Sequence, residues 1–259
     1  RAQIDEATAK REKAQAERQR VMAQLAAGVS VAVTTEKPKA TPKRKQPGIL
    51  TQSDLKLIEA SAEIMSTPPD GEDMAFTHSV LCQVGLPRSK FDGREFMRQS
   101  GAAWINVQAG WLDEGKGPVQ QPVPYGPLPR LALAWISTQA VRTKDREIAI
   151  GSSASEFLRL LGKPTTGGVR GSFNTLRKQM HALAACRLQL GFKGRTFNGQ
   201  PVEQFDAWLA NRETGQQALW PGLLVLSDGY FNSMVEIAVP LDNRALMALS
   251  DSALALDVY

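Results

Sequence analysis

The sequence is poor in the residues that build metal, redox and disulfide sites. Among 259 residues there are two cysteines, Cys82 and Cys186, and two histidines, His78 and His181. None of them lies at the spacing of a Cys-x-x-Cys, His-x-His or His-Glu-x-x-His motif. We therefore expect no metal site, no disulfide framework and a protein of the reducing cytoplasm.

Catalytic and membrane signals are absent as well. The sequence has no Gly-x-Ser-x-Gly nucleophile motif, and its three tyrosines lack the histidine pair that a metal-dependent nicking tyrosine needs. The glycine-rich segment 167–171 lacks the Gly-Lys-Ser/Thr ending of a nucleotide-binding loop, so ATP is not expected. No apolar run approaches the roughly 20 residues that cross a bilayer. These absences predict a protein that is not an enzyme, has no cofactor and has no membrane partner.

Acidic residues are missing from one long stretch. Between Phe157 and Val202 there is no Asp or Glu, and this stretch contributes a charge of +8, whereas the whole chain has a net charge of +5. Charge segregated in this way favours a polyphosphate partner such as nucleic acid. The alternative is a solvated basic surface without a dedicated partner. The basic residues of the stretch are Arg159, Lys163, Arg170, Arg177, Lys178, Arg187, Lys193 and Arg195.

The first 48 residues differ in composition from the rest. Residues 1–27 are rich in Ala, Arg, Lys, Glu and Gln, with few large apolar side chains, which favours a solvated charged helix over a coiled coil. Residues 34–48 combine three prolines with five basic side chains, which is typical of a disordered linker. We therefore expect a largely disordered charged arm and basic linker over 1–48 and a folded domain over 49–259.

The remaining sequence predicts an α+β fold. Ser153 and Glu156 form a capping-box pattern at the start of one helix, and Pro129 lies in the first turn of another. The expected elements are a helix over 128–142, a strand over 147–150, helices over 154–161 and 172–185, and strands over 186–192 and 223–226 as candidate partners. This order is that of a winged-helix domain. We also expect a helix over 53–65 and strands between 104 and 112, so that additional N-terminal helices and a small antiparallel sheet precede the winged-helix elements.

The helix over 172–185 is the candidate recognition helix. At about 100° per residue, one face carries large apolar side chains that should pack on the core. The opposite face carries amide, basic and hydroxyl side chains, the types that contact bases and phosphates in a major groove. An ordinary solvent-facing helix remains the alternative, because such helices carry the same residue types. The predicted DNA contacts of this helix and the loop before it are Arg170, Ser172, Asn174, Thr175, Arg177, Lys178 and His181.

Two further predictions concern the N-terminus of this helix and the residues after the strand that follows it. Ser172 is expected to cap its N-terminus. Lys193 and Arg195 follow the strand over 186–192 and are expected to lie in a wing that reaches the DNA backbone or minor groove. A plain surface loop is the alternative for these two residues.

Several short segments recur together, in order, in a known family. They are Val123–Leu131 (VPYGPLPRL), Ala134–Thr143 (AWISTQAVRT), Ser155–Gly162 (SEFLRLLG), Thr166–Gly168 (TGG), Leu176–Met180 (LRKQM), Val239–Asp242 (VPLD) and Ala253–Tyr259 (ALALDVY). In these segments the chain resembles the plasmid-encoded RepA replication initiators, and the resemblance extends over roughly residues 76–259.

The resemblance implies a bacterial, plasmid-encoded cytoplasmic initiator built from winged-helix domains. Such proteins bind repeated sequences in the double-stranded DNA of a replication origin, help to open the duplex, and recruit the host initiator and replicative helicase. Many also repress their own gene as homodimers. In relatives the segment that ends here at Tyr259 leads into further sequence, often a second winged helix. The resemblance therefore predicts that residues 49–259 are a winged-helix domain, either in a fragment truncated before a second winged helix or in a short member of the family.

Two alternatives remain open. A dimeric transcriptional autorepressor would read an inverted repeat with the same helix and open no duplex, whereas an initiator binds direct repeats. A protein-interaction scaffold would dock a partner through residues 1–27 and bind an acidic surface through the basic stretch. Salt dependence and sequence preference on DNA distinguish this scaffold from the other two.

Overall fold

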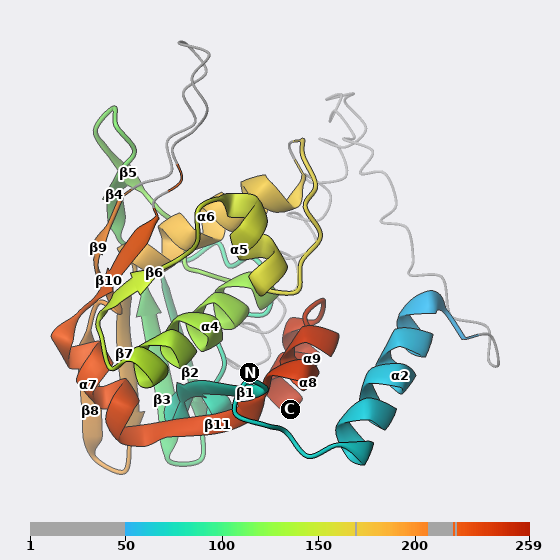
Figure 1. Cartoon of the computed structure of the whole chain (residues 1–259). Coiled ribbons are helices and arrows are strands. Elements are labelled where there is room, and N and C mark those ends of the chain that lie inside the picture. Colours follow the sequence, from blue (N-terminus) through green and yellow to red (C-terminus); the bar gives the residue numbers. More distant parts are fainter. Residues whose placement is uncertain (1–49, 169, 207–219, 221) are drawn as a thin grey trace, which may run out of the picture. The chain divides into compact units, whose positions relative to one another are not determined.

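The computed structural model describes residues 50–168, 170–206, 220 and 222–259. The predicted charged arm and linker over 1–48 lie outside the described residues. Residues 50–259 form one packing unit of helices and small antiparallel sheets, as Figure 1 shows. The predicted α+β class is therefore confirmed.

Helix α4 (Pro127–Thr143) lies in the core of this unit. Two prolines stand in its first turn, where a missing backbone N–H costs no hydrogen bond, and Gly126 before it adopts a positive φ of 83°. The helix packs against β1, α6, α7 and α9, so its apolar side chains are covered on several sides. Its buried residues are Leu128, Pro129, Leu131, Ala132, Leu133, Ala134, Ile136, Ser137, Thr138 and Ala140.

A four-stranded antiparallel sheet has the order β2-β3-β7-β8. Its strands are β2 (Glu95–Ser100), β3 (Ala103–Gln108), β7 (Arg187–Phe192) and β8 (Arg195–Gly199). Alternate residues of β3 and β7, such as Ile105 and Leu188, are buried on one face. The strand predicted over 186–192 is present, but its predicted partner is wrong. Residues 223–226 pair elsewhere, because strand pairing depends on contacts that a local pattern does not encode.

A three-stranded antiparallel sheet has the order β6-β10-β9. Its strands are β6 (Glu147–Ala149), β9 (Val202–Phe205) and β10 (Leu223–Leu226). Helices α5 (Ala154–Leu160) and α6 (Ser172–Ala185) follow β6 in the chain and precede β9. The hairpin β7–β8 is inserted between α6 and β9 and belongs to the other sheet.

The remaining elements are two pairs of strands and several helices. A ribbon of β1 and β11 packs on α4, and α2 packs on α8. A separate hairpin, β4–β5, contacts α6 through β4 (Figure 1). These elements are α2 (Gln52–Ser66), β1 (Met74–His78), α3 (Ser79–Gln83), β4 (Trp111–Asp113), β5 (Pro118–Gln120), α7 (Asp228–Ile237), β11 (Ala238–Asp242), α8 (Asn243–Ala248) and α9 (Ala253–Val258).

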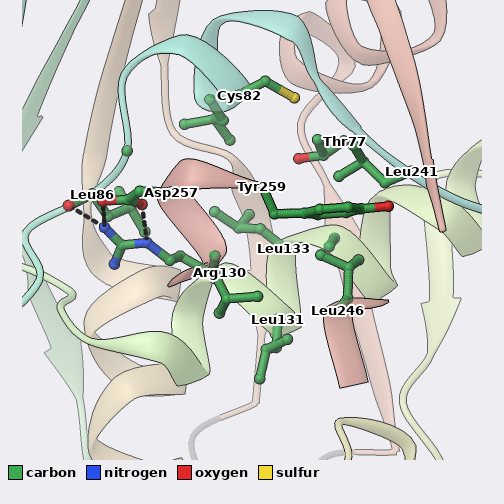
Figure 2. A pocket seen from close by; sticks show the side chains of 14 residues that line it. Thr77, Cys82, Leu86, Arg130, Leu131, Leu133, Leu241, Leu246, Asp257 and Tyr259 are labelled. Carbon is green, nitrogen blue, oxygen red and sulfur yellow. Dashed lines mark hydrogen bonds and ion pairs between the residues drawn. The ribbon is translucent and has the colours of Figure 1, made fainter. Parts of the chain in front are cut away.

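The last helix, α9, is held by one carboxylate. Asp257 accepts hydrogen bonds from Arg130 Nε and Arg88 Nε, each at 2.7 Å, and Arg98 lies at 3.7 Å. Figure 2 shows Arg130 and Asp257 together, with Tyr259 lying across an apolar cavity beside them. Gly85 makes room for the carboxylate, because a Cβ there would lie 2.2 Å from an Asp257 oxygen.

Candidate nucleic-acid interface

Helix α5 begins at a side-chain cap. The Ser153 hydroxyl accepts a hydrogen bond from the backbone N–H of Glu156 at 3.2 Å, as the capping-box pattern predicts. The reciprocal bond is displaced by one residue, since the Glu156 carboxylate accepts from the backbone N–H and the hydroxyl of Ser152. Gly162, at a φ of 66°, follows the end of the helix, and Pro164 comes two residues later.

The turn between α5 and α6 is closed by hydroxyl groups. The backbone N–H of Thr166 donates to the Ser172 hydroxyl at 2.8 Å, and the backbone N–H of Ser172 donates to the Thr166 hydroxyl at 2.9 Å. The Asn174 amide donates to the Gly168 carbonyl at 2.9 Å. The prediction that Ser172 caps α6 is wrong, because Gly171 is the N-cap and Ser172 is already helical. Ser172 and Asn174 therefore hold the turn in place.

Only the first half of α6 is exposed. Leu176, Met180 and Leu183 are buried as predicted, and Phe173 packs against the core. Thr175 and Lys178 are exposed, Asn174 and Arg177 are half-buried, and Arg170 is exposed just ahead of the helix. Every residue from Gln179 to Ala185 is buried. In a helix-turn-helix protein the N-terminal part of the recognition helix contacts the bases, and this is the part of α6 that solvent reaches.

The prediction that His181 projects from the outer face of α6 is wrong. Its side chain is 3 % exposed, and its Nδ1–H donates to the Glu114 carboxylate at 3.0 Å. Its ring also lies edge-on to Phe205, with the centroids 6.0 Å apart. Burial lowers the pKa of His181, although the carboxylate acts in the opposite direction. The helical wheel places His181 outward, but the β4–β5 hairpin and β9 cover the second half of the helix.

The basic stretch does not form a single surface. Lys163 pairs with Asp251 at 2.7 Å and is only 10 % exposed, so it supports the chain near α9. Arg195 pairs with Glu236 of α7 at 2.9 Å. Arg170, Arg177 and Lys178 are the members of the stretch that belong to α6 and the loop before it. The charges are divided because the chain between Phe157 and Val202 passes from α5 and α6 into the β7–β8 hairpin of the four-stranded sheet.

Lys193 and Arg195 were predicted to lie in a wing, with a plain surface loop as the alternative. They lie at the β7–β8 turn, where Lys193 and Gly194 both have positive φ, as a tight hairpin requires. That hairpin belongs to the four-stranded sheet, whereas the strands that pair around β6 are β10 and β9. Most of the connection between β9 and β10 lies outside the described residues.

A groove beside α6 was not predicted from the sequence. It has a volume of about 360 Å³ and lies between α6 and the β4–β5 hairpin. Three basic side chains line it, namely Lys90, Arg177 and Lys178, together with the Glu114 carboxylate. The segment Glu114–Gly117, which contains two glycines between apolar residues, is the local signal that could have predicted this hairpin. No local signal placed that hairpin against α6.

Other hollows offer less to a polyanion. The cavity behind Tyr259 measures about 100 Å³ and is mainly apolar, and another, of about 410 Å³, lies beside His78 and Ser233. In the described part of the chain, His, Cys, Asp and Glu side chains do not gather in groups of three that could hold a metal ion. Among the same residues, no helix has the length and apolarity to cross a bilayer.

Comparison with known proteins now identifies the family. The family model described as "Plasmid encoded RepA protein" matches residues 123–259, slightly more than half of the chain. This match includes α4, α5, α6 and the three-stranded sheet, but not the β4–β5 hairpin. No curated protein and no solved structure matches the chain. The resemblance seen in the sequence is therefore confirmed, and the chain belongs to the family of plasmid-encoded RepA proteins.

Proposed function

We propose that this protein is a sequence-specific DNA-binding initiator of plasmid replication. In this proposal it binds repeated sites in the double-stranded DNA of an origin, promotes opening of the duplex, and recruits the host initiator and replicative helicase. Membership of the plasmid-encoded RepA family supports a role in plasmid replication. The observation that carries the DNA-binding part is α6, whose N-terminal half alone is exposed and has no acidic side chain.

The arrangement around α6 supports a winged-helix domain. The order α4, β6, α5, α6, β9, β10, with β10 central in its sheet, is the order of helices and strands in a winged helix. We propose that this domain lies within residues 49–259 and that the β7–β8 hairpin is an insertion in it. In such a domain Arg170, Asn174 and Thr175 face the bases in the major groove, and Lys193 and Arg195 contact DNA only through phosphates.

Mechanical work on the DNA follows from binding at several sites. Each bound copy uses part of its binding free energy to bend its DNA site. The resulting strain in the DNA opens an adjacent A·T-rich segment. This mechanism needs no catalytic side chain in the protein. It requires sites repeated in the same orientation, which separates it from repression through one inverted repeat.

Nuclease footprinting over the DNA that flanks the gene tests this function. We expect several evenly spaced protected blocks that persist at physiological salt. A single symmetric block would instead favour a dimeric repressor. Protection without boundaries, seen only at low salt, would mean that the basic residues bind phosphates without reading sequence.

A pair of variants tests whether the N-terminal end of α6, together with the loop before it, reads the sequence. Arg170→Ala should reduce the preference for the origin site over random DNA by tenfold or more, since a bidentate arginine–guanine contact contributes about 1–3 kcal/mol. Lys193→Ala should weaken both DNAs about equally. Equal losses of preference in the two variants would show that α6 is not the reading element. Competition binding at fixed salt measures both quantities.

A further inference from the structure

The groove between α6 and the β4–β5 hairpin brings together basic side chains from distant parts of the chain. Lys90 comes from the segment before β2, while Arg177 and Lys178 come from the last exposed turn of α6. The β4–β5 hairpin supplies Glu114 and Val119. The groove therefore continues the exposed half of α6 towards a second element of the protein.

The walls of this groove are held together by a hydrogen-bond network. Glu114 Oε1 accepts from His181 at 3.0 Å and from the Gln121 amide at 2.9 Å. On the α6 side, the side-chain Oε1 of Gln179 accepts from the backbone N–H of Tyr125 at 2.8 Å. Gly110 allows close approach, because a Cβ there would lie 1.8 Å from the Ala185 carbonyl oxygen. The hairpin is thus docked on α6 before any ligand arrives.

The charge of the groove favours an anion. Three cations line it against one carboxylate, Glu114. Burial opposes ionisation of Glu114, but the hydrogen bonds from His181 and Gln121 outweigh it and lower its pKa. Lys90 has an ion pair with Asp92 at 3.1 Å, but both side chains are largely exposed, so exchanging this partner for another anion costs little. No ion pair among the described residues involves Arg177 or Lys178.

The size and lining of the groove favour the sugar–phosphate backbone of DNA over a free nucleotide as its ligand. A volume of about 360 Å³ lies at the low end of sites for small molecules. Val119, Pro122 and Tyr125 supply the apolar part of its lining, and no glycine-rich loop contributes to it. The groove therefore lacks the backbone loop that holds the phosphates of a free nucleotide, whereas the cations at its edge suit the phosphate oxygens of a DNA strand.

We propose that this groove holds the sugar–phosphate backbone of one DNA strand, with Lys90 on one wall and Arg177 and Lys178 on the other. The inference rests on the proposed DNA-binding function and deepens it. It assigns Arg177 and Lys178 to phosphates, which leaves base reading to Arg170, Asn174 and Thr175. It also gives the β4–β5 hairpin, which precedes the family match, a role in positioning DNA.

The test compares Lys90→Ala with Lys56→Ala, which removes the same charge from the exposed surface of α2. Lys90→Ala should weaken origin and random DNA about equally. It should also reduce the slope of log K against log salt by about 0.9, the value for one lost phosphate contact. Lys56→Ala should leave both quantities unchanged, and Lys90→Arg should restore them. Titrations at several salt concentrations measure the slope.

Ethylation of single DNA phosphates locates the phosphate that Lys90 contacts in this proposal. Ethylation of one phosphate beside the bases read by α6 should reduce the affinity of the native protein but not that of Lys90→Ala. Lys90→Ala could behave like Lys56→Ala while Arg170→Ala still loses its preference for the origin site. In that case the proposed sequence-specific binding is supported, and the proposal that the groove holds the DNA backbone is wrong. If the native protein binds no DNA preferentially, the proposed function itself fails.

A calorimetric titration with a nucleoside triphosphate tests whether the groove binds a free nucleotide instead of the DNA backbone. We expect no saturable binding. Saturable binding that Lys90→Ala abolishes would overturn the backbone assignment in favour of a free nucleotide.

Discussion

At the scale of single residues, a buried histidine shows how the core constrains a titratable group. His78 is 1 % exposed and lies at the N-cap of α3. Its Nδ1 accepts from the backbone N–H of Val80 at 3.2 Å, so the neutral ring carries its proton on Nε2 and donates to the Ser233 hydroxyl at 3.1 Å. Burial lowers its pKa from 6.5 to about 4. A second proton on Nδ1 would point at the Val80 N–H and break the cap.

We therefore predict that the protein loses stability in mild acid. Between pH 6.5 and 4 the unfolded chain binds a proton at residue 78 and the native protein does not, so the free energy of unfolding falls as the pH is lowered. The loss should reach roughly 3 kcal/mol. Urea unfolding at pH 7 and pH 4.5 measures it. His78→Asn keeps an acceptor for Val80 and should lose stability less steeply over the same range; an identical decline would exclude His78 as the cause.

At the scale of elements, the position of the β4–β5 hairpin depends on one glycine. Gly110 precedes β4 and lies against the carbonyl group at the end of α6. The backbone N–H of Gln121, just after β5, donates to the Gly110 carbonyl at 2.9 Å. Both ends of the hairpin are thus fixed near the C-terminus of α6, and the groove beside Arg177 depends on that arrangement.

Gly110→Ala should destabilise the protein, because the new Cβ meets a backbone atom that cannot rotate away. The expected cost is about 1–3 kcal/mol in the free energy of unfolding. Gly71→Ala is the matched control, since no atom lies within 4 Å of its Cβ position. Thermal unfolding of both variants checks the prediction. Equal midpoints for the two would mean that the hairpin does not pack on α6 as described.

At the scale of the whole molecule, one carboxylate joins the end of the described chain to its core. Asp257 is 8 % exposed and Arg130 is 10 % exposed. Arg130 also donates to the carbonyl groups of Pro87 and Gly126, at 3.0 and 2.8 Å. Helix α9 is therefore tied to α4 and to the loop before β2, the loop that also carries Lys90 and the groove wall.

We predict that Asp257→Asn lowers the free energy of unfolding by about 3 kcal/mol, because the buried arginine loses its charged partner. Glu236→Gln is the control. Its carboxylate is 56 % exposed and its partner Arg195 is 78 % exposed, so the change should stay below about 1 kcal/mol. Limited proteolysis should also cleave near α9 faster in Asp257→Asn. Unchanged stability and proteolysis would show that α9 docks through its apolar residues alone.

Local sequence patterns determined the helices of the candidate site. Helix α6 begins at Ser172 and ends at Ala185 as predicted, and α4 and α5 lie within one residue of their predicted bounds at each end. The reason is that caps, prolines, glycines and the 3.6-residue period act between residues close in the chain. The inward face of α6 followed from the same period. The family was also recognisable, because its segments are short and contiguous.

The tertiary structure alone decided which elements surround α6. It paired residues 223–226 with β6 and β9, divided the basic stretch between two helices and the β7–β8 hairpin, and buried His181 against Glu114. It also brought Lys90 and the β4–β5 hairpin to α6. Strand pairing and docking join residues far apart in the chain, and their energies depend on which surfaces meet. The sequence by itself therefore determined helix α6, its basic residues and the family of the chain, and the packing around that helix decided which of its charges are exposed to solvent.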